Sequence, residues 1–240
     1  MKKPLFEKLQ AARAAKRPVA VVTRLADGQQ ALVEGGQKPF GELALDARQL
    51  AAAETALVED RSGLLPEPDQ GLFLQVFNPP LRLFLVGAVH ISQALAPLAA
   101  LAGYEVTVID PRRAWATESR FPGIALVDEW PDEGLKTLKP DRRSAIVTLT
   151  HDPKLDDPAL LVALPSPAFY VGALGSKRTH AKRIERLKAE GLDDASMARI
   201  HGPVGLAIGA KSPAEIAISI LAQMTQVLRQ GGDKSRRAAA

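Results

Sequence analysis

Hydrophobic and polar residues follow two different patterns along the chain, and the change falls near residue 79. Before that point the apolar runs are short and the segments between them are polar or glycine-rich. The spacing predicts helices over 5–16 and 46–61 and strands over 18–25, 29–34 and 71–77. An Asp27-Gly28 pair between the first two strands is typical of a hairpin turn. We therefore expect a small α+β domain over residues 1–78.

Strands alternate with helices after Pro79 and Pro80, which cannot donate hydrogen bonds to a sheet and so mark a boundary. This alternation predicts a parallel sheet with helices on both faces. Ser212 and Glu215 form a capping-box pattern before the last helix. The expected strands are 82–86, 104–109, 144–150 and 168–172, and the expected helices are 91–102, 156–164, 179–190 and one from 213 onward. The fold class is thus α/β, with a Rossmann-like domain over 79–230 and a disordered tail over 231–240.

The turn after the first of these strands keeps the frame of a dinucleotide-binding unit but breaks its glycine fingerprint. Gly87 remains, whereas Val89 and Ser92 stand where G-x-G-x-x-G has its second and third glycines. Asp110 follows 23 residues after Gly87, where an acid that binds ribose belongs. An anionic ligand is expected at the start of the following helix, but ordinary NAD binding is disfavoured. The alternative is a βαβ unit that only builds the sheet.

Polar residues follow each of the four predicted strands. Because the carboxyl ends of parallel strands meet at one edge, these residues should lie along one rim. The fourth turn combines two glycines, Ser176, Lys177 and Arg178 before a helix, which favours an anion cradle. Alternatives stay open: Asp110 could cap a turn, His90 could pack or cap, and the two cations could be solvated. The candidate binding residues at the four strand ends are Gly87, His90, Asp110, Arg112, His151, Asp152, Gly172, Gly175, Ser176, Lys177 and Arg178.

Composition narrows the function classes. The chain has 31 basic and 27 acidic residues, a net charge of +4, which is a mild excess, and few aromatic residues. Nucleic-acid binding is therefore a minor alternative, motivated mainly by the basic helix over 177–188. No window approaches 18 uninterrupted apolar residues, so we expect a cytoplasmic protein without a membrane span. The four histidines lack metal-site spacing and there is no cysteine, which argues against a protein-held metal and a catalytic thiol.

Several motifs, in this order along most of the chain, resemble the XdhC/CoxI family of accessory proteins for molybdenum hydroxylases such as xanthine dehydrogenase and carbon monoxide dehydrogenase. They are GAVHISQAL, VTVIDPR, ESRFP, VTLTHDPKLDDPAL, FYVGALGSKRTHAKR and IHGPVGLAIGAKSPAEIAISILA. The resemblance implies a small N-terminal domain followed by a Rossmann domain. It also implies that the rim residues named above bind molybdenum cofactor, in its molybdopterin or its dinucleotide form.

This resemblance implies a chaperone and not an enzyme: the protein would bind and protect the cofactor, assist its sulfuration and hand it to an apo molybdenum hydroxylase. Because the chain has no cysteine, a separate cysteine desulfurase would have to supply sulfur. A homodimer is a further expectation. The alternative from another class is an NADPH-dependent oxidoreductase, in which Arg112 and Arg113 would face a ribose 2′-phosphate.

Overall fold

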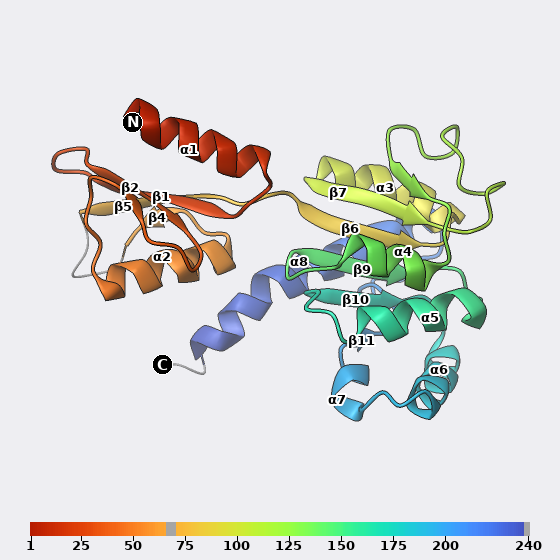
Figure 1. The fold of residues 1–240 in the computed structure, drawn as a ribbon. Coiled ribbons are helices and arrows are strands. Elements are labelled where there is room, and N and C mark those ends of the chain that lie inside the picture. Colours follow the sequence, from red (N-terminus) through yellow and green to blue (C-terminus); the bar gives the residue numbers. More distant parts are fainter. Residues whose placement is uncertain (66–70, 238–240) are drawn as a thin grey trace. The chain divides into compact units, whose positions relative to one another are not determined.

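Two units make up the chain in the computed structural model, which describes residues 1–65 and 71–237 (Figure 1). The first unit comprises Met1–Pro79 and the second Pro80–Ala240. The expected boundary at residues 78 and 79 lies beside this division. Each unit has its own sheet and its own hydrophobic clusters.

The N-terminal unit is an antiparallel sheet with one helix on each face. Its strands have the order β3-β2-β1-β5-β4. Strand β1 is apolar along most of its length because both faces are covered: Ala20 and Val22 pack in the cluster with α2, whereas Val19 and Val21 pack with α1. The elements are α1 (Lys3–Ala14), β1 (Val19–Arg24), β2 (Gln30–Glu34), β3 (Phe40–Gly41), α2 (Ala47–Glu59), β4 (Gly63–Leu64) and β5 (Leu72–Phe77).

The C-terminal unit is a parallel sheet with the strand order β11-β10-β9-β6-β7-β8. This is a Rossmann-like arrangement, so the predicted fold class is confirmed. Helices α3 and α8 cover one face, and α4 and α5 cover the other (Figure 1). The elements are β6 (Leu81–Val86), α3 (His90–Leu101), β7 (Tyr104–Ile109), β8 (Ala125–Val127), α4 (Pro131–Leu138), β9 (Ser144–Thr148), α5 (Pro153–Ala163), β10 (Tyr170–Ala173), α6 (Lys177–Ala189), α7 (Asp194–Met197), β11 (Ile200–His201) and α8 (Pro213–Arg237).

Local sequence and structure agree at the start of α8 and differ elsewhere. The Ser212 hydroxyl accepts from the backbone N–H of Glu215 at 3.3 Å, and the Glu215 carboxylate accepts from the backbone N–H of Ser212 at 2.9 Å. The periodicity did not predict β8, α4, α7 or β11, which are all short. Helix α8 continues to Arg237 and so extends into residues 231–240, which we expected to be a disordered tail; residues 238–240 lie outside the described residues.

No helix within residues 1–65 and 71–237 is long and apolar enough to cross a membrane.

Candidate functional site

In the sheet of the C-terminal unit the strand order reverses between β6 and β9. Strands β7 and β8 follow β6 toward one edge of the sheet, and β10 and β11 follow β9 toward the other edge. Ligands of open parallel sheets bind outside the carboxyl ends of the strands at such a point. Gly87 begins the loop after β6 and has φ +108°. A Cβ atom there would lie 2.5 Å from Cγ2 of Thr150, in the loop after β9. Glycine is therefore needed both for the backbone conformation and for the close approach of the two loops.

Ser92 shows why the glycine fingerprint can be broken without losing the turn. Its side chain is buried, and its hydroxyl donates to the backbone oxygen of Gly87 at 2.5 Å. A small residue with an internal hydrogen bond thus replaces the third glycine. Val89 is the N-cap of α3 and supplies no side-chain cap, so the first turn keeps N–H groups for a ligand. His90, the first helical residue, is exposed on this rim.

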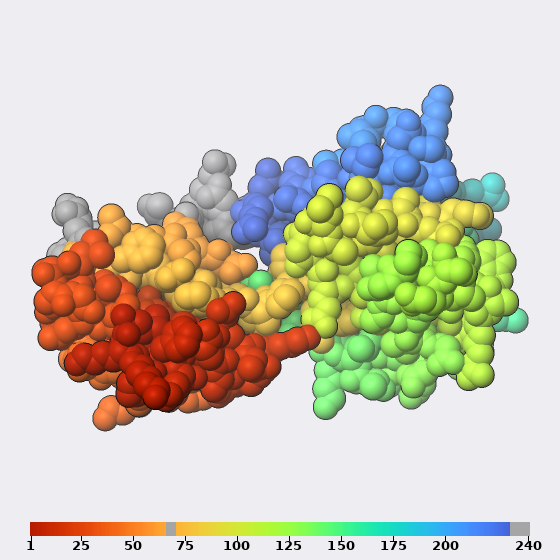
Figure 2. All heavy atoms as spheres, turned by 90° about the horizontal axis from the view of Figure 1, so that it is seen from above, coloured from red at the N-terminus to blue at the C-terminus, as the bar shows by residue number. Residues whose placement is uncertain are grey.

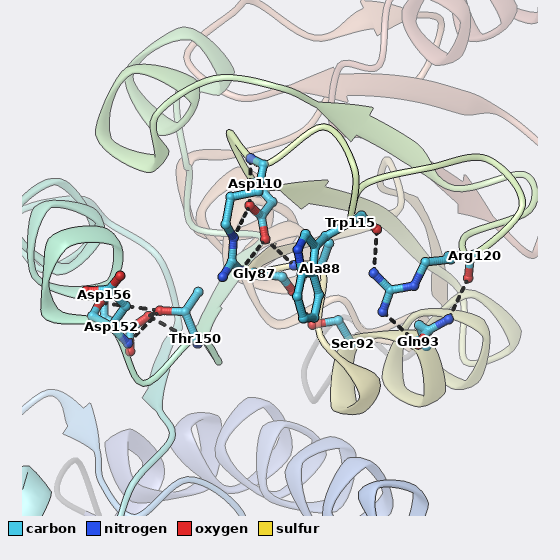
Figure 3. Close-up of polar contacts among 11 residues, drawn as sticks. Gly87, Ala88, Ser92, Gln93, Asp110, Trp115, Arg120, Thr150, Asp152 and Asp156 are labelled. Carbon is cyan, nitrogen blue, oxygen red and sulfur yellow. Dashed lines mark hydrogen bonds and ion pairs between the residues drawn. The ribbon is translucent and has the colours of Figure 1, made fainter.

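Asp110 follows β7 and is fully buried, with both carboxylate oxygens engaged (Figure 3). Oδ2 accepts from the backbone N–H of Ala88 and from Nη2 of Arg112, both at 2.7 Å. Oδ1 accepts from the backbone N–H and Nε of Arg112, both at 2.9 Å. Burial alone would raise the pKa of Asp110, but these hydrogen bonds outweigh it and hold the pKa below its usual value. The carboxylate is therefore ionised and fixes the loop after β6.

Arg112 is the cation that this carboxylate positions. Its side chain is 38% exposed, and its hydrogen bond with Asp110, followed by the charges of Asp110, Asp152 and Asp156, raises its pKa despite partial burial. The guanidinium lies 5.2 Å from the ring centre of Trp115. Arg112 thus stays charged, partly open to solvent, and in the electrostatic field of the loop after β9.

The connection between β7 and β8 continues from Arg112 and covers part of one face of the C-terminal unit beside α3 (Figure 2). Arg120 holds it in place: Nη1 donates to the backbone oxygen of Trp115 at 2.6 Å, and Nη2 donates to Oε1 of Gln93 on α3 at 2.9 Å. Trp115 is 44% exposed. Trp115 and Arg120 were not among the residues predicted for the site, although the ESRFP motif contains Arg120.

The loop after β9 is organised by Thr150. Its hydroxyl donates to Oδ1 of Asp156 at 2.7 Å and accepts from the backbone N–H of Asp152 at 3.0 Å. Asp152 caps α5, because its carboxylate accepts from the backbone N–H of Lys154 at 2.9 Å. His151 is exposed and has φ +62°, a conformation that costs energy for a residue with a side chain. Figure 3 shows Thr150, Asp152 and Asp156 as one group across from Asp110.

The glycines and Ser176 of the fourth turn have internal roles. Gly172 is buried within β10, where a Cβ would lie 2.6 Å from Cγ2 of Val204. Gly175 has φ +143°, and its Cβ would lie 3.0 Å from Cγ2 of Thr179. Ser176 is the N-cap of α6 and accepts from the backbone N–H of Thr179 at 3.1 Å. Lys177 is exposed at the start of the helix. The turn thus positions the start of α6 more than it encloses a ligand.

A cavity of about 150 Å³ lies between the loop after β9, the start of α5 and one side of α6. Of the predicted residues, His151 and Arg178 meet here, whereas Lys177 and Gly172 do not line it. The basic residues of α6 recur at helical spacing, a signal that the sequence contains. We expected Lys177 and Arg178 to belong to an anion cradle, and the whole basic helix was considered only as a nucleic-acid surface. The lining residues are His151, Pro153, Asp156, Arg178, Thr179, Lys182, Arg183 and Arg186.

The structure therefore divides the predicted residues into groups. Gly87, Asp110 and Arg112 meet where the strand order reverses, with His90 beside them on α3. His151 and Asp152 follow the neighbouring strand β9. The fourth turn lies one strand further along, on β10. In the part of the chain that the structure describes, no three acidic or histidine side chains gather closely enough to hold a metal ion.

Comparison of the sequence with known proteins identifies the family of this chain. The family model described as the XdhC Rossmann domain matches residues 83–224. The chain is 36% identical over 169 residues to a Bacillus subtilis (strain 168) protein whose name describes it as a probable subunit of xanthine dehydrogenase, and the match covers 69% of this chain and 49% of that protein. It is 32% identical over 151 residues to "Molybdenum cofactor insertion chaperone PaoD" of Escherichia coli (strain K12), covering 63% and 41%.

A third relative, "Uncharacterized protein YqeB" of Escherichia coli (strain K12), is 33% identical over 160 residues, 65% of this chain and 29% of that protein. The chain thus spans less than half the length of these curated relatives. A crystal structure from Bacillus halodurans described as a xanthine dehydrogenase superposes with a TM-score of 0.75, at 24% identity, over 97% of this chain and 68% of that one. This likeness shows that the fold is shared.

Proposed function

The chain belongs to the XdhC family, and from this premise we propose that it is an accessory protein that binds molybdenum cofactor and assists its maturation and insertion into an apo molybdenum hydroxylase. The observation that carries the proposal is the family match over residues 83–224, together with a relative named as a molybdenum cofactor insertion chaperone. The polar residues at the carboxyl rim support it, because the cofactor has an anionic phosphate end.

The rim fits such an anionic group. The first turn of α3 has no side-chain cap, and Arg112 beside it is charged and partly exposed. Helix N-termini and arginine side chains are the usual donors to phosphate oxygens. We propose direct contacts from Gly87, His90, Arg112 and His151, whereas Asp110 and Asp152 would position the loops. Ser176, Lys177 and Arg178, with Gly172 and Gly175 shaping their turn, would complete the cationic side.

The bound cofactor supplies the redox chemistry of the enzyme that receives it. The residues of this chain would bind it, exclude water and release it, and we propose no catalytic residue among them. A cysteine desulfurase would supply any sulfur that the cofactor needs, because the chain has no cysteine. This work would take place in the cytoplasm, with a homodimer as the proposed assembly.

The competing oxidoreductase function requires an acid or a free cation for the ribose of NADPH. Asp110 occupies the expected position, but it is fully buried and its two oxygens already accept from Ala88 and Arg112. A ribose hydroxyl would have to displace a charge-assisted hydrogen bond. This arrangement disfavours nicotinamide nucleotide binding.

The test is anaerobic equilibrium binding of the full chain to isolated molybdenum cofactor, with NADPH titrated in parallel. The variant Arg112→Gln keeps a donor for Asp110 but removes the charge, and Arg113→Gln is its matched control, since Arg113 is paired with Asp128 on the surface. We expect saturable cofactor binding that is weakened about tenfold by R112Q and unchanged by R113Q. Binding of NADPH without cofactor would overturn the proposal.

Insertion is tested separately by mixing the loaded chain with an apo molybdenum hydroxylase and measuring how fast its activity appears. The loaded chain should activate the apo-enzyme faster than an equal amount of free cofactor. Equal rates would mean that the chain binds the cofactor without assisting insertion.

A further inference from the structure

The cavity beside α6 contains a buried arginine whose hydrogen bonds are incomplete. Arg183 is 2% exposed, and its Nη2 donates to the backbone oxygen of Leu174 at 2.7 Å. Its Nε and Nη1 have no hydrogen-bond partner among the described residues. A buried donor without a partner costs about 1–3 kcal/mol, more when it is charged. The fold therefore maintains two unused donors of one guanidinium beside an open cavity.

Asp156 is the acid in this cavity, and it satisfies Arg183 only in part. Its Oδ2 lies 3.7 Å from Nη2 of Arg183, too far for a hydrogen bond, and this oxygen also has no partner among the described residues. Its Oδ1 accepts from Thr150. Burial raises the pKa of Asp156 although the hydrogen bonds from Thr150 and the charge of Arg183 oppose this effect. Asp156 thus leaves Nε and Nη1 of Arg183 without a partner in the described part of the chain.

Positive charge outweighs negative charge on the remaining walls. Arg178, Lys182 and Arg186 recur every four residues on α6 and so lie on one side of the helix. Arg186 is held by Asp157 on α5, with Nη2 donating to Oδ1 at 3.0 Å. His151 and the Thr179 hydroxyl add further polar groups. Several cations therefore surround a space of about 150 Å³, which exceeds what a single water needs.

We propose that this cavity is a binding site for a phosphate or diphosphate group. The unpaired Nε and Nη1 of Arg183 can each donate to a phosphate oxygen, and lysine, arginine and threonine side chains can satisfy the remaining oxygens. The site is distinct from the first turn of α3, because it is built from α5, α6 and the loop after β9. The existence of this site does not depend on the proposed function, and only the identity of the molecule that carries the phosphate does. That molecule is either the cofactor, through its phosphate end, or a free phosphate compound.

The experiment titrates the full chain with inorganic phosphate and with pyrophosphate, measured by calorimetry at low ionic strength. The test variant is Arg178→Ala/Lys182→Ala, whose two residues line the cavity and are exposed, so that the fold should persist. The control is Lys188→Ala/Lys211→Ala, which removes the same charge from exposed positions of the same unit outside the lining. We expect one saturable site whose affinity falls at least tenfold in R178A/K182A and less than threefold in K188A/K211A.

No saturable binding of either probe, or equal losses in the two double variants, would overturn the proposal. Competition identifies the carrier: if pyrophosphate displaces bound molybdenum cofactor, the cofactor's own phosphate occupies the cavity, and if both bind together, a free phosphate compound does. The two proposals can fail separately. Pyrophosphate binding without cofactor binding would support this site and refute the proposed function, whereas cofactor binding without binding of either phosphate probe would do the reverse.

Discussion

Replacing Asp110 with asparagine tests whether this residue is a structural anchor. The carboxylate holds the backbone N–H of Ala88 and the guanidinium of Arg112 in a fully buried position. Asparagine keeps the shape but has an NH2 group in place of one oxygen. The donors to that oxygen lose their partner, and they include a backbone N–H in either orientation: that of Ala88 at Oδ2 or that of Arg112 at Oδ1. If Asp110 instead served only to bind a ribose, the substitution would leave the unliganded protein equally stable.

The magnitude follows from the exposure of each partner. A buried N–H left without an acceptor costs about 1–3 kcal/mol. Arg112 is 38% exposed and can regain water, so its lost ion pair adds only about 1 kcal/mol. We expect D110N to lower the free energy of unfolding of the C-terminal unit by about 2–4 kcal/mol. With a urea dependence of about 2 kcal/mol per molar, the midpoint should fall by roughly 1–2 M.

Tryptophan fluorescence during urea unfolding measures this unit alone, because the chain has two tryptophans, Trp115 and Trp130, and both lie in it. The matched control is Asp128→Asn, which breaks the Asp128–Arg113 pair at 2.8 Å on the surface. That pair is 55% and 83% exposed, so its loss should cost less than about 1 kcal/mol. A D110N midpoint no lower than that of D128N would refute the reasoning.

Three further predictions concern pH and the local geometry. The pKa of Asp110 is lowered in the folded state, so its contribution to the free energy of unfolding is present above the unfolded pKa of about 3.9 and is lost as the pH falls through the folded pKa. The urea midpoints of the parent and D110N should therefore converge below about pH 4. A constant gap between the two midpoints would contradict this. Gly87→Ala should cost about 1–3 kcal/mol of unfolding free energy, because its Cβ would lie 2.5 Å from Cγ2 of Thr150, and adding Thr150→Ser should recover part of the loss; additive losses would exclude that contact. Ser212→Ala should cost about 1 kcal/mol by removing the N-cap of α8, measured by thermal unfolding, and an unchanged melting temperature would show that the cap is dispensable.

The sequence by itself determined the architecture of this protein. Apolar runs alternating with helical periodicity identified the parallel sheet after Pro80, and capping residues located the start of α8, because both signals depend on local spacing. The short elements β8, α4, α7 and β11 were not predicted, since two to eight residues carry too little periodicity. The order of polar residues at strand ends also indicated which rim to inspect.

Only the tertiary structure decided what each polar residue does there. Asp110 could equally have been a ligand-binding acid, and its contact with Ala88, 22 residues earlier, depends on the pairing of β6 with β7. Ser176 caps a helix, whereas Arg183, which the FYVGALGSKRTHAKR motif contains but to which we had assigned no role, lines a cavity and has two unused donors. The physical reason is that spacing along one chain fixes the face on which a side chain lies. The partner it meets, and hence its charge and exposure, depends on elements that only folding brings together.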